Sequence, residues 1–300
     1  MRIRKDKNNT MIEGIRDFDL AQTLECGQCF RFYQQDIEDY VIVAYHSLLH
    51  IRQEADKIIF FNKTEEEVRN IWIPYFDLER DYGEIKRFLL SGDKTLEPAI
   101  HEKSGVRILN QEFHEMLISF IISQNKQIPH IKQIVKKLSE RYGDYLGKIN
   151  GEKYYSFPDI CQLAKVTEQG FREMKAGFRA PYLVDAAGKL LSGQISEDDL
   201  RQKSEEETRK KLMEIKGVGE KVANCVMLFS LGWRQAFPID VWVKRIMETL
   251  YYDGADTSKE EIAQLAKKMY GAYGGYAQQY LFCFGRDNKV GIKNNKLECS

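Results

Sequence analysis

The chain has 300 residues, and its 45 Lys and Arg balance its 45 Asp and Glu, so the formal net charge is zero. A neutral chain does not bind nucleic acid by overall charge, as a histone does, although it can still carry local basic faces. No segment approaches the roughly 20 apolar residues that span a bilayer, so a cytoplasmic, globular protein is expected. Of the six cysteines only Cys26 and Cys29 form a CxxC pair, which is too few for a zinc or iron–sulfur set.

The first hundred residues have the pattern of an antiparallel sheet. Short runs of β-branched and aromatic residues, separated by polar breaks, occur as "FRFYQQ", "DYVIVAYHSLLHIRQ" and "DKIIFFN". A short helix is predicted at "TEEEVRNIWIPYF", because its acidic first turn suits the positive end of the helix dipole.

From about residue 108 the strand signals vanish and apolar residues recur at helical spacing. A helical segment interrupted at "SQNKQIP" is followed by predicted helices at 158–165, 180–191, 205–215, 221–231, 241–250, 258–270 and 274–284. The fold class is therefore α+β, with a sheet-rich domain at 1–107, a helical body at 108–290 and a polar tail at 291–300.

The segment "TRKKLMEIKGVGEKVANCVMLFSLG" is predicted to be a helical hairpin with a tight Gly-Val-Gly turn. Gly217 and Gly219 permit a sharp turn and leave amide groups at a helix N-terminus unobstructed, which suits phosphate binding. A GxG pattern alone is weak, because a plain αα-hairpin uses glycines in the same way. The Walker spacing is missing, and no strand precedes the turn as a dinucleotide fingerprint requires.

Lys221 lies at the start of the second helix, where a cation meets the unfavourable end of the dipole at a cost of about 0.3–1 kcal/mol. That field and partial burial against Val222 favour the neutral amine, which is a nucleophile suited to Schiff-base chemistry. A solvated lysine beside Glu220 is an equally good interpretation of these residues alone.

Asp240 follows "FPI" and is first of all a predicted N-cap for "VWVKRIMETL". A cap that faces the mouth of the preceding hairpin would also bring its carboxylate near Lys221.

This segment, "GVGEKVANC" followed by "PID", resembles the helix-hairpin-helix superfamily of DNA base-excision glycosylases. In that superfamily a lysine at the position of Lys221 marks the bifunctional glycosylase/lyase members. Further motifs, "LECGQCFRF" and "GYAQQYLF", resemble the 8-oxoguanine DNA glycosylase branch, and the resemblance covers most of the chain.

The resemblance implies a pocket for the flipped base. The Gly27 carbonyl would accept a hydrogen bond from N7–H of 8-oxoguanine, which guanine lacks, since guanine N7 is itself an acceptor. Gln278 would bind the Watson–Crick edge, and Phe282 and Cys225 would stack on the two faces. Without the resemblance, a turn glycine and ordinary core packing explain Gly27, Phe282 and Cys225.

The resemblance also implies the contacts with duplex DNA. "SQNKQI" would fill the gap left by the base, and Phe178 in "GFRAPY" would be the stacking wedge, with Arg179 beside it. His130 stands where mammalian members have an arginine that reads the opposite cytosine, and Trp242 replaces a phosphate-binding histidine, so a preference for cytosine is open. The predicted DNA contacts are Asn125, Lys126, Gln127, His130, Phe178, Arg179, Gly217, Gly219, Val222 and Trp242.

The implied mechanism is excision through a Schiff base on Lys221, followed by strand cleavage by β-elimination, with Asp240 stabilising positive charge on the sugar. No redox cofactor is required, and a monovalent or divalent cation could be held by the carbonyls of Met213, Ile215 and Val218. The expected partner is double-stranded DNA carrying oxidised guanine, bound by a monomer that is nucleoid-associated if prokaryotic. The alternatives are a glycosylase for another damaged base and a non-catalytic DNA-binding module.

Overall fold

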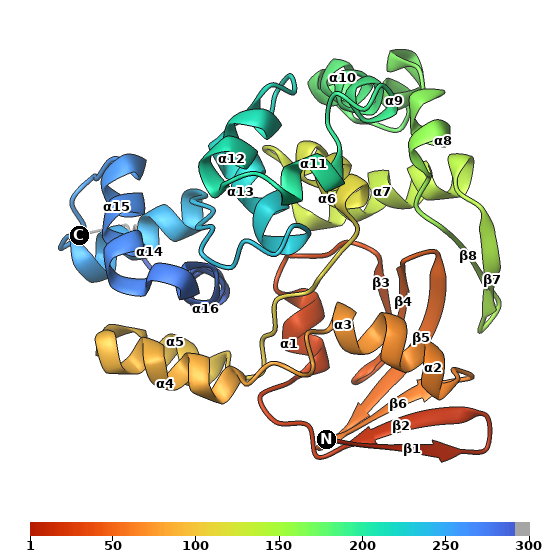
Figure 1. Cartoon of the computed structure of the whole chain (residues 1–300), viewed down its shortest axis with the longest axis horizontal. Coiled ribbons are helices and arrows are strands. Elements are labelled where there is room, and N and C mark those ends of the chain that lie inside the picture. The colour runs from red at the N-terminus through yellow and green to blue at the C-terminus, as the bar shows by residue number, and fades with distance from the viewer. Residues whose placement is uncertain (292–300) are drawn as a thin grey trace, which may run out of the picture. The chain divides into compact units, whose positions relative to one another are not determined.

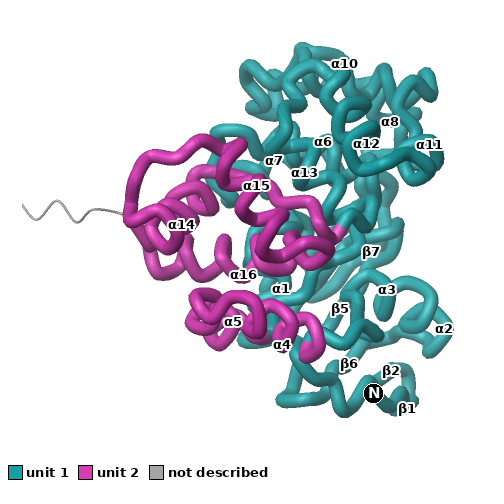
Figure 2. Tube along the Cα trace, turned by 60° about the vertical axis from the view of Figure 1, so that its left-hand side comes forward, with its two compact units in different colours: residues 1–82, 105–233 teal, residues 83–104, 234–300 magenta. Residues whose placement is uncertain are grey.

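The computed structural model describes residues 1–291, and it divides into two compact units (Figure 2). Unit 1 comprises residues 1–82 and 105–233, and unit 2 comprises 83–104 and 234–300. The predicted boundaries at 107 and 290 stay a prediction, because units assembled from separate segments do not divide the chain at single points. Most of the predicted tail, from residue 292 on, lies outside the described residues.

A six-stranded antiparallel sheet with the order β1-β2-β6-β5-β4-β3 lies in unit 1 (Figure 1). The three predicted runs form β3 to β6, and the polar N-terminal segment adds an edge hairpin, β1–β2, that the alternation did not suggest. The strands are β1 (Arg2–Asp6), β2 (Asn9–Glu13), β3 (Phe32–Asp36), β4 (Asp39–Ala44), β5 (Ser47–Glu54) and β6 (Lys57–Phe61).

One face of this sheet holds the core of its half of unit 1. The predicted helix at 64–76 is present as α2 (Glu65–Glu67), a π-helical turn η1 (Val68–Trp72) and α3 (Ile73–Tyr75), and Thr64 caps it in a capping box with Glu67. Trp72 is fully buried in this core and belongs to the same hydrophobic cluster as sheet residues such as Ile42 and Phe60. Helix α1 (Leu20–Glu25) buries Leu20 and Leu24 in the same cluster.

The prediction that strands end near residue 108 is wrong. A two-stranded hairpin, β7 (Tyr145–Ile149) and β8 (Glu152–Tyr155), packs Tyr154 against the second face of the large sheet, in a cluster with Val41 and Val43. Its turn is Asn150-Gly151, and both residues have positive φ. This dipeptide is a strong hairpin signal that overrides the helical surroundings.

The helices of unit 1 follow the predicted order. The segment interrupted at "SQNKQIP" forms two helices because Gln124 and Asn125 leave helical geometry, and Pro129 opens the second helix. These helices are α6 (Phe113–Ser123), α7 (Ile128–Tyr142), α8 (Ile160–Ala164), α9 (Glu168–Glu173), η3 (Gly177–Arg179), α10 (Ala180–Leu191), α11 (Glu197–Arg201), α12 (Glu205–Met213) and α13 (Glu220–Phe229).

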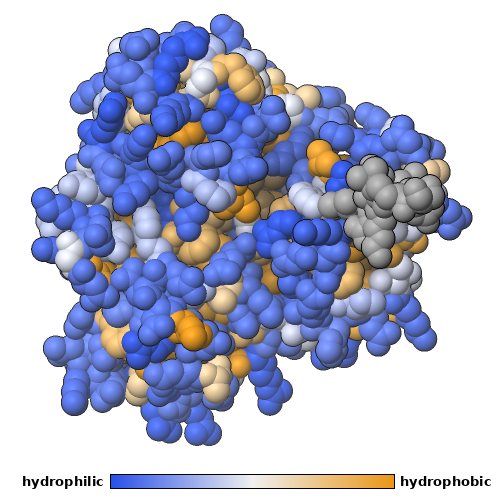
Figure 3. Space-filling view, turned by 180° about the vertical axis from the view of Figure 1, so that it is seen from behind, coloured by the Kyte–Doolittle hydropathy of each residue, from blue (hydrophilic) through white to orange (hydrophobic). Residues whose placement is uncertain are grey.

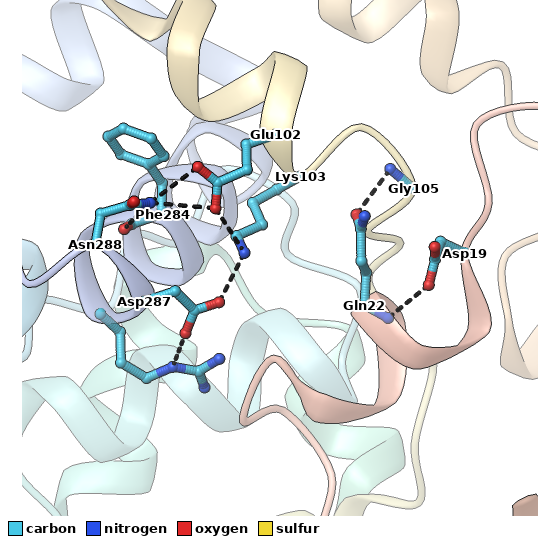
Figure 4. A network of polar contacts seen from close by, with 9 residues as sticks. Asp19, Gln22, Glu102, Lys103, Gly105, Phe284, Asp287 and Asn288 are labelled. Carbon is cyan, nitrogen blue, oxygen red and sulfur yellow. Dashed lines mark hydrogen bonds and ion pairs between the residues drawn. The ribbon is translucent and has the colours of Figure 1, made fainter. Parts of the chain in front are cut away.

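Unit 2 joins a short segment from the first hundred residues to the last helices of the chain. Lys103, at the end of one helix, contacts Glu102 at 2.9 Å and Asp287 of the last helix at 2.7 Å (Figure 4). In unit 1, Asp19 caps α1 through the Gln22 amide, and Gly105 N–H donates to Gln22. The elements of unit 2 are α4 (Tyr82–Gly92), η2 (Lys94–Leu96), α5 (Glu97–Glu102), α14 (Val241–Tyr251), α15 (Lys259–Tyr270), η4 (Gly271–Tyr273) and α16 (Gly274–Asp287). Helix α4 begins at Tyr82, one residue before the first residue of unit 2.

Hydrophilic side chains predominate on the face drawn in Figure 3, where hydrophobic residues form small separate groups. No helix among residues 1–291 combines the length and the apolar character that a membrane crossing needs.

Candidate active site and nucleic-acid interface

The predicted helical hairpin is present in unit 1 as α12, a turn and α13. Ser204 starts α12 with a capping box to Glu207, and the apolar residues that recur along the hairpin are buried, namely Leu212, Ile215, Val218, Val222 and Val226. Gly217 has φ of +75°, and a Cβ atom there would lie 2.2 Å from Cδ2 of Tyr182. Only glycine therefore fits at this position, because both the backbone and the neighbouring ring exclude a side chain.

Helix α13 begins without a side-chain cap. Its N-cap residue is Gly219, in extended backbone geometry, and no side chain among residues 1–291 accepts from the first amides of the helix. Gly217 and Gly219 are exposed, and nothing lies within 4 Å of the position of a Cβ on Gly219. Uncapped amides at a helix N-terminus form an anion site, so the turn has the geometry predicted for phosphate binding.

Lys221 lies in the first turn of α13 and is half-buried. Its Nζ atom lies 5.2 Å from the centre of the Phe120 ring of α6. Phe120 in turn stacks on Phe229 at 5.6 Å and meets the edge of Phe30 at 5.7 Å. Within the described residues Lys221 has no ion pair, so the amine rests on an aromatic surface rather than on a carboxylate. Its position favours the reactive-lysine interpretation over that of a solvated surface lysine.

Two further predicted pocket residues belong to unit 1. Cys225 lies one helical turn after Lys221 in α13 and is 3% exposed. Gly27 lies between α1 and β3 with φ of +85°, a conformation that favours glycine. Its carbonyl oxygen has no hydrogen-bond partner among residues 1–291, which leaves it available to an external donor.

Gln28 holds the Gly27 turn in place, and the sequence analysis missed it. The side chain is fully buried; Nε2 donates to the carbonyls of Thr23 and Arg107, and Oε1 accepts from Leu109 N–H at 2.9 Å. The signal was a polar glutamine between the apolar residues of "CGQCFRF", since a buried amide must satisfy its hydrogen bonds.

Asp240 is the N-cap of α14 in unit 2, which confirms the capping prediction. Its Oδ1 accepts from Val243 N–H at 2.8 Å. The residue is half-buried, and the next residue, Val241, is 68% exposed. The indole ring of Trp242 lies under the Arg245 guanidinium at 5.3 Å, which places a cation beside the predicted phosphate contact.

Gln278 and Phe282 share one face of α16, also in unit 2. Gln278 is 4% exposed, and its Oε1 has no hydrogen-bond partner among the described residues. A buried acceptor without a partner is rare in folded proteins and marks a place where a ligand can donate. Phe282 is half-buried with the Arg286 guanidinium 5.5 Å from its ring.

Phe178 and the Asn125 loop lie together in unit 1. Phe178 is 53% exposed, as a wedge must be, and the Arg179 guanidinium lies 4.2 Å from its ring. Arg179 itself is only 3% exposed and donates to the carbonyls of Gln124 and Asn125. The structure therefore uses Arg179 to position the loop, and a direct contact of Arg179 with DNA stays a prediction.

The other loop residues surround this contact. Asn125, with φ of +50°, is exposed, as are Gln127 and His130 at the start of α7. Burial and the neighbouring Arg179 charge lower the pKa of Lys126. A nearby anion would stabilise the charged form of Lys126, so this position suits a contact with a DNA phosphate.

The carbonyl groups predicted to hold a cation flank the hairpin turn. Met213 ends α12, and the Ile215 carbonyl accepts from Val218 N–H at 3.0 Å, which leaves its second lone pair for another ligand. Carbonyl oxygens are suitable ligands for hard cations, and a cation at this turn stays a prediction.

Comparisons with known proteins agree with this geometry. Residues 11–117 match the 8-oxoguanine DNA glycosylase N-terminal domain, and residues 118–271 match the HhH-GPD superfamily of base excision DNA repair proteins. The structure of an 8-oxoguanine glycosylase/lyase of Clostridium acetobutylicum, in complex with double-stranded DNA that contains cytosine opposite 8-oxoG, superposes with a TM-score of 0.93. The two chains are 38% identical, and the match covers 97% of this chain and 99% of that one.

Two curated relatives also match this chain over most of its length. The N-glycosylase/DNA lyase of Saccharomyces cerevisiae is 29% identical over 314 residues, which cover 88% of this chain and 82% of the relative. A probable N-glycosylase/DNA lyase of Methanothermobacter thermautotrophicus is 25% identical over 300 residues, with 91% and 95% covered. This chain therefore belongs to the 8-oxoguanine DNA glycosylase family within the HhH-GPD superfamily of base excision DNA repair proteins.

Proposed function

We propose that this protein is a bifunctional DNA glycosylase and AP lyase that removes 8-oxoguanine from duplex DNA. The observation that carries the proposal is Lys221, a half-buried amine without an ion pair in the described chain, at the uncapped N-terminus of α13. The Clostridium relative is an 8-oxoguanine glycosylase/lyase, which supports the same substrate.

The reaction proceeds by displacement at the sugar. The neutral Lys221 amine attacks C1′, the C1′–N9 bond breaks, and the base leaves with the bonding electrons and takes up a proton. Loss of a proton from nitrogen and opening of the sugar ring give a Schiff base. This iminium acts as an electron sink, so that loss of a C2′ proton eliminates the 3′ phosphate and cleaves the strand. Neither step requires a redox cofactor.

Asp240 has a separate task in this proposal. As positive charge builds on the sugar in the transition state, a carboxylate preorganised by its helix cap stabilises that charge without reorganisation. Its second oxygen is the one that would face the sugar, because Oδ1 accepts from Val243 N–H.

The damaged base is recognised by groups with unused hydrogen-bonding capacity. The Gly27 carbonyl accepts from N7–H of 8-oxoguanine, whereas guanine would place a lone pair against it, at a cost of about 1–3 kcal/mol. The Gln278 amide binds the Watson–Crick edge, and Phe282 and Cys225 pack on the faces of the base. These contacts rest on the family resemblance together with the unpartnered acceptors on Gly27 and Gln278.

DNA is held by the amides of Gly217, Gly219 and Val222, with a cation on the hairpin carbonyls as a further link to phosphate. Phe178 enters the stack beside the flipped nucleotide, and the Asn125 loop fills its place. We expect the protein to act as a monomer where the genomic DNA lies, in the cytoplasm at the nucleoid if the organism is prokaryotic.

Borohydride trapping tests the chemistry directly. The wild-type protein should become covalently fixed to duplexes that contain 8-oxoguanine, because borohydride reduces the Schiff base, and Lys221→Gln should give no adduct. Lys210→Gln, at an exposed lysine of α12 paired with Glu206, should trap as well as the wild type.

Running the assay with each of the four bases opposite the lesion measures what His130 reads. A wild-type protein that binds lesion DNA but forms no adduct would be a DNA-binding module rather than a lyase. An adduct with another damaged base, and none with 8-oxoguanine, would change the substrate and keep the mechanism.

A further inference from the structure

Helix α10 contacts the Gly-Val-Gly turn through side chains that no part of the proposed chemistry uses. Asp185 Oδ2 accepts from Lys216 N–H at 2.8 Å, immediately before the turn. The same oxygen accepts from Lys189 Nζ at 2.9 Å, and Lys189 also donates to the Glu214 carbonyl at 2.6 Å. One Asp–Lys pair on α10 therefore binds one donor and one acceptor of the segment that joins α12 to α13.

This pair is shielded more than an ordinary surface ion pair. The side chains of Asp185 and Lys189 are 16% and 18% exposed. Burial alone would raise the pKa of Asp185, but the Lys216 amide and the Lys189 ammonium outweigh it and lower the pKa below its ordinary value. The carboxylate is thus charged at neutral pH, and each of its contacts with the turn is charge-assisted.

Tyr182 supplies a second contact from the same helix. Its ring occupies the space that a side chain at Gly217 would need, with Cδ2 only 2.2 Å from the position of that Cβ. The ring also meets the edge of Phe178 at a centroid distance of 6.2 Å and an angle of 78°. Tyr182 therefore touches both the hairpin turn and the exposed wedge.

The contacts continue from the wedge to the Asn125 loop. Arg179 lies over Phe178 and donates to the carbonyls of Gln124 and Asn125. Within unit 1, three elements that are separate in sequence, the 124–125 loop, Phe178 and the 216–219 turn, are thus connected through η3 and the first turns of α10.

We propose that Asp185, Lys189 and Tyr182 are positioning residues that hold the hairpin turn in its DNA-binding conformation and set its distance from the Phe178 wedge. This inference rests on the proposed function, since it assumes that the turn binds phosphate. The physical reason is entropic. A glycine-rich turn has many conformations, and a preformed arrangement of amides binds phosphate more tightly because less freedom is lost on binding.

The sign of one effect separates positioning from simple electrostatics. If Asp185 acted only through its charge, its removal would strengthen DNA binding, because a negative group near a phosphate site would be lost. If Asp185 positions the turn, Asp185→Ala should weaken binding of duplex DNA about tenfold, the effect of losing one hydrogen bond to a charged group. Asp185→Asn should bind at least as tightly as the wild type, because its amide oxygen still accepts from Lys216 N–H while the negative charge near the phosphate site is removed.

Asp199→Ala is the matched control. Asp199 of α11 and Lys203, two residues past the end of that helix, form an Asp–Lys pair with the same four-residue spacing at 2.8 Å, and among residues 1–291 neither side chain contacts the turn. Asp199→Ala should leave the dissociation constant for duplex DNA unchanged. Tyr182→Phe should bind DNA as tightly as the wild type, because it keeps the aromatic ring that packs beside Gly217. Tyr182→Leu lacks this ring and should bind DNA more weakly.

Amide hydrogen exchange of the free protein provides a readout that does not depend on DNA. The Lys216 amide should exchange about tenfold faster in Asp185→Ala than in the wild type, and at the wild-type rate in Asp185→Asn and Asp199→Ala. Unchanged exchange at Lys216 in a folded Asp185→Ala, or DNA binding as tight as that of the wild type, would overturn the inference. If the Lys216 amide exchanges as expected in all three variants, but the wild-type protein neither binds lesion DNA nor is trapped on it, the proposed function is wrong instead. The role assigned to the turn in phosphate binding would then be wrong as well.

Discussion

Helices α13 and α14 begin in opposite ways, although both start after a tight, glycine- or proline-containing segment. Helix α14 carries Asp240 as its N-cap, and the carboxylate accepts from Val243 N–H. Helix α13 starts at Gly219 without a cap and places Lys221 in its first turn. An N-terminus that is satisfied internally stabilises the fold, whereas one that is left open keeps its amides for an external anion.

The two residues also differ in the cost of their placement. Asp240 meets the favourable end of a helix dipole, so its cap and its charge both stabilise α14. Lys221 meets the same end with the wrong sign, and the described structure compensates only with the face of Phe120. Lys221, the residue proposed to react, thus destabilises the start of its helix, whereas Asp240, the residue proposed to assist, stabilises the start of its own.

Among the variants that test this comparison, Asp240→Asn should have the largest effect, which is on the rate of excision. Asparagine caps a helix as well as aspartate, so the free energy of unfolding should stay within about 0.5 kcal/mol of the wild type. Excision should slow about a hundredfold or more, because the charge that stabilises the sugar in the transition state is lost. Single-turnover excision of 8-oxoguanine measures this, and an unchanged rate would remove Asp240 from the mechanism.

Gly219→Asp would make α13 begin as α14 does. The position accepts a side chain, since its φ of −100° is ordinary and the space around a Cβ is open. The new cap should raise the free energy of unfolding by a few tenths of a kcal/mol. It should also weaken duplex binding about tenfold, because the carboxylate takes the amides and repels phosphate.

Gly219→Ser separates these two causes, since serine caps the helix without adding charge. Fluorescence anisotropy with a labelled duplex should rank the wild type above Gly219→Ser, and Gly219→Ser above Gly219→Asp. Equal affinities for all three would show that the amides of α13 do not bind DNA.

The smallest expected effect is the change in stability caused by Asp240→Ala, a variant that should also lose excision for the same reason as Asp240→Asn. Removing the cap should lower the free energy of unfolding by about 1 kcal/mol, as measured by urea denaturation. Asp240→Ser should recover that stability without recovering excision. If Asp240→Ala unfolds at the same urea concentration as the wild type, the carboxylate contributes nothing as a cap.

Much of the candidate site was predictable because its signals are local. The Gly-Val-Gly turn, the cap at Asp240 and the spacing of Gln278 and Phe282 depend on residues within a turn or two of each other, and the structure has all three. The signal for the hairpin β7–β8, the dipeptide Asn150-Gly151, is equally local. The hairpin was missed because the surrounding segments are helical.

Other features could not be inferred from local patterns. Arg179 was predicted to contact DNA because it is a cation beside Phe178, yet the fold buries it against the carbonyls of Gln124 and Asn125. Nothing near Gln28 indicated that its amide would join Thr23, Arg107 and Leu109. The assembly of 83–104 with 234–300 as one unit was likewise hidden, because the ion pair between Lys103 and Asp287 joins residues far apart in sequence.

The sequence by itself determined which groups are present and which backbone each can adopt, because helix caps, glycine turns and apolar spacing act over a few residues. It therefore determined that one helix begins with an aspartate cap and another with two glycines and a lysine. Only the tertiary structure decided that Phe120 lies under Lys221, that Tyr182 fills the space beside Gly217 and that Asp185 holds the Lys216 amide. These contacts join residues between 31 and 101 positions apart, and chain packing, not local propensity, chooses such partners.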